Sequence, residues 1–145
     1  MANPPQTFEN HAKFVPGYHV VTSLALTVNL GWRVYRAGAD FSAGTVVDLV
    51  LACGLILLAY YARAFALRVQ DRVIRLEMRL RLARLLPPDL LADSGRLEVG
   101  QLIALRFAGD AELPGLVRRV LADKMTDRKA IKRMVQDWQA DELRA

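Results

Sequence analysis

The segment "RVIRLEMRLRLARLL", residues 72–86, decides how this chain folds, because arginines and large apolar residues are interleaved along it. It contains neither proline nor glycine, and this predicts a helix. At about 100° per residue, four arginines follow one side of that helix. These four, the arginine row, are Arg68, Arg72, Arg75 and Arg79. Apolar residues flank the row on both sides, and a helix with two apolar faces needs neighbours on two sides.

The two apolar faces use different residues. The first face consists of Val69, Val73, Leu76, Leu80 and Ala83. The second face consists of Leu67, Ile74, Met78, Leu82 and Leu85. The remaining, polar side consists of Gln70, Glu77, Arg81 and Arg84. On that side Glu77 and Arg81, four residues apart, can form an ion pair. We expect one apolar face to pack on the C-terminal helices of the chain itself, and the other, with the arginine row, to meet a neighbouring subunit or lipid headgroups.

Two stretches upstream of this helix are almost free of charge. Residues 14–32 contain no charged residue, and residues 41–62 contain one, Asp48. Each stretch has about the ~20 residues that a helix needs to cross the hydrocarbon core of a membrane. We therefore predict an all-α integral membrane protein whose residues 17–67 form a transmembrane helical hairpin, with two spans at about 17–35 and 44–65.

The distribution of arginine predicts the orientation of the hairpin. Arg33 and Arg36 lie near the loop between the spans, whereas seven arginines lie between Arg63 and Arg84. Positive charge is in excess on the cytoplasmic side of membrane proteins. We thus expect the N-terminal tail (residues 1–16) and the C-terminal region (residues 68–145) to be cytoplasmic. Between Gly54 and Pro87 no glycine or proline interrupts the chain, so the second span should extend into the cytoplasm as one helix.

Beyond Pro87 the pattern predicts a small helical subdomain. Its helices are expected at residues 97–108, at 111–121 with Asp110 as N-cap, and at 127–143 with Thr126 as N-cap. The last of these would carry one apolar face of Ile131, Met134, Val135 and Trp138. Helices of this length are marginal alone, so we expect them to fold back on the long helix.

A few single residues are candidates for contacts. Ser23 and Thr27 share a face of the first span, and such polar groups hydrogen-bond between membrane helices. Trp138 is interpreted most simply as a core anchor, with a contact to a partner as the alternative. Asp48 lies in the first turn of the second span, where the helix dipole and interfacial water or Arg36 can stabilise it. The alternative to this structural role of Asp48 is coupling to the movement of a proton or a substrate.

No pattern predicts catalysis or a cofactor. The chain shows no phosphate-binding loop, no nucleophile with a base, and no cluster of metal ligands, and His19 has no partner histidine at helical spacing. We expect no enzymatic activity, no metal and no cofactor of its own, while a bound lipid is compatible with the pattern. The arginine row lacks the stacking aromatics of nucleic-acid sites. It predicts contact with anionic lipid headgroups or with protein, and not with nucleic acid.

Four stretches of the chain resemble a known family. They are "FENHAKF" (8–14), "VIRLEMRLR" (73–81), "QLIALRFAGDAELPGLVRR" (101–119) and "IKRMVQDWQAD" (131–141). The family consists of small bacterial two-span membrane proteins and is known only as a domain of unknown function. The resemblance covers the whole chain. It implies a protein of the bacterial inner membrane with a helical cytoplasmic part, and it brings no active site.

Taken together, these features predict a non-catalytic accessory or scaffolding subunit of a larger bacterial membrane complex, photosynthetic or respiratory, with other membrane subunits as partners. A stand-alone membrane-anchored adaptor that recruits soluble proteins through the C-terminal helices is the first alternative. A small oligomeric transporter built around Asp48 is the second.

The hairpin can be tested by labelling. In a Cys53→Ala background, a cysteine that replaces Ala39 should react with a membrane-impermeant thiol reagent added to the outer face, because residues 36–43 are predicted to lie outside the cytoplasm. A cysteine at Arg144 should be protected until the membrane is opened. Protection of the loop, or labelling of the C-terminal position, would contradict the orientation.

Overall fold

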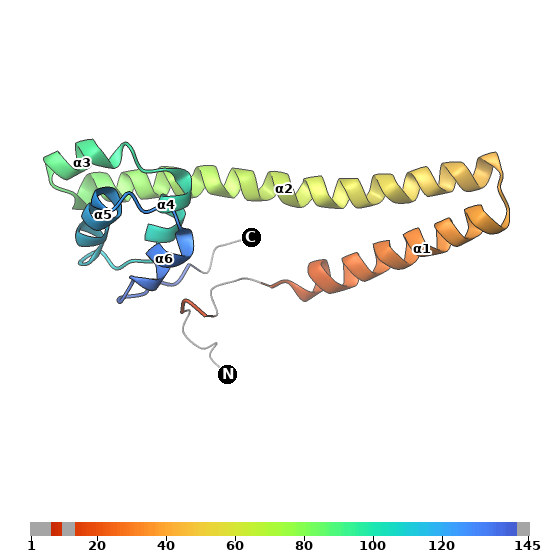
Figure 1. The fold of residues 1–145 in the computed structure, drawn as a ribbon, viewed down its shortest axis with the longest axis horizontal. Helices are drawn as coiled ribbons and strands as arrows, with labels where there is room; N and C mark the ends of the chain where they lie inside the picture. The colour runs from red at the N-terminus through yellow and green to blue at the C-terminus, as the bar shows by residue number, and fades with distance from the viewer. Residues whose placement is uncertain (1–6, 10–13, 142–145) are drawn as a thin grey trace. The chain divides into compact units, whose positions relative to one another are not determined.

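The computed structural model describes residues 7–9 and 14–141, and this part of the chain is all-α, as predicted (Figure 1). The elements in chain order are the π-helix η1 (Gly17–Thr22) and the α-helices α1 (Ser23–Ala39), α2 (Ala43–Leu85), α3 (Pro88–Ser94), α4 (Val99–Leu105), α5 (Leu113–Ala122) and α6 (Arg128–Arg133). Among the described residues, the one β-type pairing is an isolated bridge between Ala108 and Trp138.

The described residues form two compact units, and α2 contributes to both. The N-terminal unit comprises residues 14–67, with η1, α1 and the first part of α2. The C-terminal unit comprises residues 68–141 together with residues 7–9, and contains the rest of α2 and helices α3–α6. Each unit is described by itself below.

In the N-terminal unit α1 and α2 run antiparallel on either side of a turn at residues 40–42 (Figure 1). The turn is fixed by reciprocal hydrogen bonds: the Ser42 amide donates to Oγ1 of Thr45 over 3.0 Å, and the Thr45 amide donates to Oγ of Ser42 over 3.3 Å. These bonds satisfy amides that a helix N-terminus leaves without intrahelical partners. Thr45 and Ala52 are the only buried residues among the described residues of this unit.

Helix α2 is uninterrupted, as the sequence predicts. Its 43 residues give a length of about 65 Å, roughly twice the thickness of the hydrocarbon core of a bilayer. It ends at Leu85, just before Pro87 and Pro88, because proline lacks an amide proton and disfavours helical backbone in the residue before it. By length and composition α2 is the one helix of the described part that can cross a membrane.

The core of the C-terminal unit shows which apolar face of α2 packs on the chain itself. Ile74, Met78 and Leu82 are buried, and they pack in one cluster with residues of α3–α6. Those partners include Leu102 and Leu105 of α4, Val117 and Val120 of α5, and Ile131 of α6. The second apolar face is therefore the inner face, and the C-terminal helices do fold back on α2.

The short helices differ from the predicted ones. The sequence prediction missed α3, although Pro88 at its first position and Asp89 after it are typical of a helix start. Helix α4 covers only Val99–Leu105, and a capping box of Glu98 and Gln101 sets its start. Asp110 does not cap α5, which begins at Leu113 after Glu112.

The last helix is much shorter than residues 127–143. Asp127, and not Thr126, caps α6 by accepting a hydrogen bond from the Lys129 amide over 2.9 Å. Helix α6 ends at Arg133, because hydrogen bonds to other parts of the unit hold the following backbone in a non-helical path. The Glu112 carboxylate accepts hydrogen bonds from the Gln136 and Asp137 amides, both over 3.1 Å. Residues 137–139 then pair with residues 107–109 through backbone hydrogen bonds of 2.7 and 2.8 Å.

Two leucines of α2 provide a matched test of this packing. Leu82→Ala should lower the free energy of unfolding of the C-terminal unit by ~2–5 kcal/mol, because Leu82 is fully buried and its loss leaves a cavity. Leu80→Ala removes the same atoms from a position that is exposed in the single chain, and in the dissociated chain it should change the unfolding free energy of the unit little. Proteolysis across a urea gradient in mild detergent measures both. Equal losses of unfolding free energy in the two variants would show that the assignment of the inner face is wrong.

Candidate functional site

The first apolar face of α2 is uncovered in the C-terminal unit. Val69, Leu76 and Leu80 are each about 60% exposed, whereas Met78 and Leu82 on the inner face are at most 3% exposed. We call the uncovered residues the apolar stripe: Val69, Val73, Leu76, Leu80 and Ala83. Contiguous exposed apolar surface of this kind marks a site of contact with protein or membrane.

The arginine row borders the apolar stripe. All four of its members, Arg68, Arg72, Arg75 and Arg79, are exposed. Within residues 7–9 and 14–141, no ion pair engages Arg72, Arg75 or Arg79. The outer side of α2 therefore combines apolar groups with adjacent positive charges.

Arg81 has a different role, which the sequence prediction missed. Its side chain is mostly buried, and its guanidinium donates to the carbonyl oxygens of Arg106 and Ala108 over 3.1 and 2.6 Å. It also lies 2.5 Å from the Asp110 carboxylate, so the expected pairing with Glu77 is wrong. The acceptors lie in the segment between α4 and α5, which no periodicity of α2 reveals. Arg81 thus ties α2 to that segment and is not part of the outer surface.

The N-terminal unit exposes most of its apolar side chains. In the most apolar window of α2, only 11% of the residues are buried. A core helix of a water-soluble domain with this composition would be mostly buried. The exposed set includes Val47, Val50, Leu51, Leu57 and Leu58. This surface fits hydrocarbon chains or other apolar helices.

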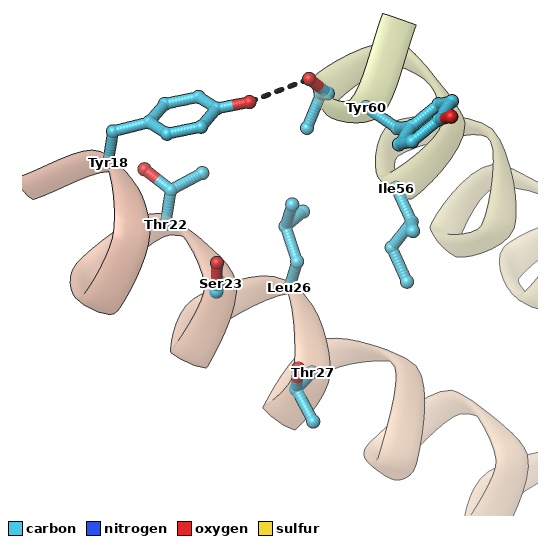
Figure 2. Close-up of a pocket in the computed structure, with 8 residues that line it drawn as sticks. Tyr18, Thr22, Ser23, Leu26, Thr27, Ile56 and Tyr60 are labelled. Atoms are coloured by element: carbon cyan, nitrogen blue, oxygen red, sulfur yellow. Dashed lines mark hydrogen bonds between the residues drawn. The ribbon is translucent and has the colours of Figure 1, made fainter. Parts of the chain in front are cut away.

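Ser23 and Thr27 lie beside a cavity of about 290 Å³ inside the N-terminal unit (Figure 2). Residues of η1, α1 and α2 line the cavity: Tyr18, Thr22, Ser23, Leu26, Thr27, Ile56, Ala59 and Tyr60. The Tyr18 hydroxyl donates to the Ala59 carbonyl oxygen over 2.7 Å and closes one side of it. The polar face of α1 is therefore turned towards α2, although Ser23 and Thr27 themselves remain exposed.

Asp48 pairs with Arg33, and not with the expected Arg36. A nitrogen of the Arg33 guanidinium lies 2.5 Å from Oδ2 of Asp48, which links α1 to α2 near their connecting turn. Asp48 is not among the residues that line the cavity. His19 is engaged locally, because its Nδ1 lies 3.0 Å from the Val15 carbonyl oxygen and its ring stacks on Phe14.

Trp138 does not lie on a helix. Its ring stacks on Phe107 with centroids 4.5 Å apart, and its backbone forms the bridge to Ala108. Phe107 is buried and also contacts the cationic groups of Arg106 and Lys132. Trp138 thereby fastens the C-terminal segment to the unit, and whether it also meets a partner stays a prediction.

The features described above are exposed surfaces of α2 and of the N-terminal unit. No three His, Cys, Asp or Glu side chains of the described residues are grouped so that they could hold a metal ion. A family profile matches the chain over residues 1–145 and identifies its family. The chain belongs to DUF6526, a family of unknown function. No curated protein and no solved structure matches it. In this DUF6526 chain, the outer side of α2 and the exposed apolar residues of the N-terminal unit are the surfaces that a partner or a membrane could contact.

Arg81 gives a test of the division between the inner and outer sides of α2. Arg81→Ala should lower the unfolding free energy of the C-terminal unit by ~1–3 kcal/mol, because two carbonyl oxygens and Asp110 lose a charged donor. Arg75→Ala on the arginine row should leave that free energy within about 0.5 kcal/mol. Urea-dependent proteolysis compares them. A silent Arg81→Ala variant would mean that this contact is not structural.

Proposed function

We propose that this protein is a non-catalytic accessory or scaffolding subunit of a larger bacterial membrane complex. In this proposal residues 17–67 cross the inner membrane as a two-span hairpin, and residues 1–16 and 68–145 are cytoplasmic. The spans contact neighbouring membrane subunits, and the outer surface of α2 contacts protein or anionic headgroups. Photosynthetic and respiratory assemblies, which gather many membrane helices, are the hosts to test first.

The observation that carries the proposal is the uncovered apolar surface of α2. The C-terminal unit already has a closed core, with Leu82, Leu105 and Val117 almost inaccessible to solvent. The apolar stripe nevertheless stays exposed on the opposite side of the same helix. Removing apolar surface from water gains about 25 cal/mol of free energy per Å². Burial of the apolar stripe would therefore be favourable, and contact with a partner is the simplest way to bury it.

The first helical run supports a second span. The elements η1 and α1 follow each other directly and contain 6 and 17 residues, which together exceed the ~20 residues that a crossing needs. Residues 14–32 carry no charge. Trp32 and Tyr35 lie at the end of this run next to Arg33 and Arg36, an arrangement typical of a membrane–water interface.

The arginines support a cytoplasmic position of the C-terminal unit. They follow the second apolar stretch directly, where basic residues are attracted by anionic headgroups and mark the cytoplasmic side. The pairing of Asp48 with Arg33 supports a structural contribution of that acid, since two opposite charges near an interface stabilise each other. In this proposal the protein acts by holding neighbours in place and performs no reaction.

The test is isolation of the native protein in mild detergent, followed by identification of the proteins that migrate with it. A subunit should travel in stoichiometric amounts with a defined membrane complex. A protein that travels alone, and binds only soluble proteins in pull-downs, would be an adaptor. Uptake of a solute by vesicles that contain only this protein, abolished by Asp48→Asn, would support a transporter. Either of these outcomes would overturn the proposal.

Two arginines on the outer side of α2 should matter for attachment. The double variant Arg68→Ala, Arg75→Ala should remain folded but leave the complex several-fold more readily than the parent protein at low salt, where charges are least screened, because exposed charges contribute to association more than to stability. Arg118→Ala, Arg119→Ala removes the same charge from exposed positions on α5 and serves as control. Equal retention of both variants in native gels would argue against a contact at the arginine row.

A further inference from the structure

The apolar stripe has the spacing of a coiled-coil seam. Its residues follow one another at steps of four, three, four and three, which is the alternation of the two inward positions, a and d, of a heptad repeat. Val73 and Leu80 then occupy a positions, and Val69, Leu76 and Ala83 occupy d positions. In sequence, Ala62 and Ala66 continue the same steps upstream. We propose that the stripe binds the same stripe of a second copy of this chain, as a parallel two-stranded coiled coil.

The inner and outer faces of α2 make this geometrically feasible. At 100° per residue the stripe is centred about 180° away from Ile74, Met78 and Leu82. The chain's own helices therefore occupy the side of α2 that a second copy would not approach. In a parallel coiled coil, a β-branched residue at an a position, as in Val73, with leucine at the following d position, as in Leu76, favours two strands.

One pair of charges beside the stripe is complementary between two copies of this chain. Positions e and g flank the seam. In a parallel coiled coil, position g of one helix faces position e of the next heptad on the other helix. Arg72 occupies such a g position, and Glu77 occupies the e position five residues later. Both are exposed, and neither forms an ion pair among the described residues. Two symmetric Arg72–Glu77 pairs would therefore form across the dimer.

The next pair of positions opposes association. Arg79 at g would face Arg84 at e of the other helix, so like charges meet at the C-terminal end of the seam. This repulsion predicts a gain of association when one charge is reversed, which a chance apolar contact would not show.

The parallel direction rests on the proposed function, because two copies inserted in one membrane with the same orientation present α2 side by side in the same direction. Both copies are also confined to one membrane, which raises their effective concentration for a short seam. A water-soluble protein could pair in the antiparallel direction, where Arg72 and Glu77 would not face each other in this way.

Cysteine cross-linking in native membranes tests the seam. In a Cys53→Ala background, Val73→Cys and Ala83→Cys should each give a disulfide-linked dimer of this chain under mild oxidation. Arg75→Cys, exposed on the same helix but away from the seam, is the matched control and should give several-fold less dimer. Cross-linking at only one of the two seam positions would indicate antiparallel pairing and overturn the proposal.

The charges are tested by reversal in the Val73→Cys protein. Glu77→Arg should weaken association roughly tenfold, because two attractive pairs become repulsive, and Arg72→Glu added to it should restore the dimer. Arg84→Glu alone should increase the yield of dimer above that of the parent. Failure of both the rescue and the gain would overturn the pairing.

The outcomes separate this inference from the proposed function. Cross-links from Val73→Cys to a different protein, or no cross-link at all, overturn the dimer, even where the chain still migrates with a larger complex. A clean dimer supports the inference. If that dimer migrates without other proteins, it is the accessory-subunit proposal that fails.

Discussion

The burial of one face of α2 by four short helices is the constraint on which the rest of this structure depends. Helices α3–α6 have between 6 and 10 residues, too few to be stable alone in water. They persist because Ile74, Met78 and Leu82 provide the apolar surface on which they pack. Since a helix presents its faces at fixed angles, this packing also determines which side of α2 is left outside.

Polar contacts then fix the segments between the short helices. Arg81 supplies donors to two carbonyl oxygens that lie outside any helix, and the Glu112 carboxylate accepts from amides of the segment after α6. Groups of this kind are costly when they are partly removed from water without partners. Two side chains therefore hold the backbone where periodic structure is absent, and they explain why the C-terminal segment lies beside Ala108 and not in a longer helix.

The two parts of α2 expose apolar residues for different reasons. In the N-terminal unit most apolar side chains of the described residues are exposed, which is the pattern that the proposed membrane position would give, since hydrocarbon would then be their solvent. In the C-terminal unit only one stripe is exposed, and it lies between a row of arginines and a polar side that contains Glu77. A narrow stripe between charges suits one helix of a partner better than a bilayer interior, and this contrast favours the proposed contact with a protein.

The sequence by itself determined the helical class, the continuous α2 and its end before Pro87, because hydrophobic period and proline act locally. It also determined that α2 has two apolar faces, but Val73 and Ile74 are equally apolar, and period alone could not say which would be buried. Tertiary structure made that choice by placing α3–α6 on the side of Ile74. It also assigned Arg81 to Asp110 instead of Glu77 and ended α6 at Arg133. These outcomes depend on residues far apart in the chain, whose meeting no local pattern encodes.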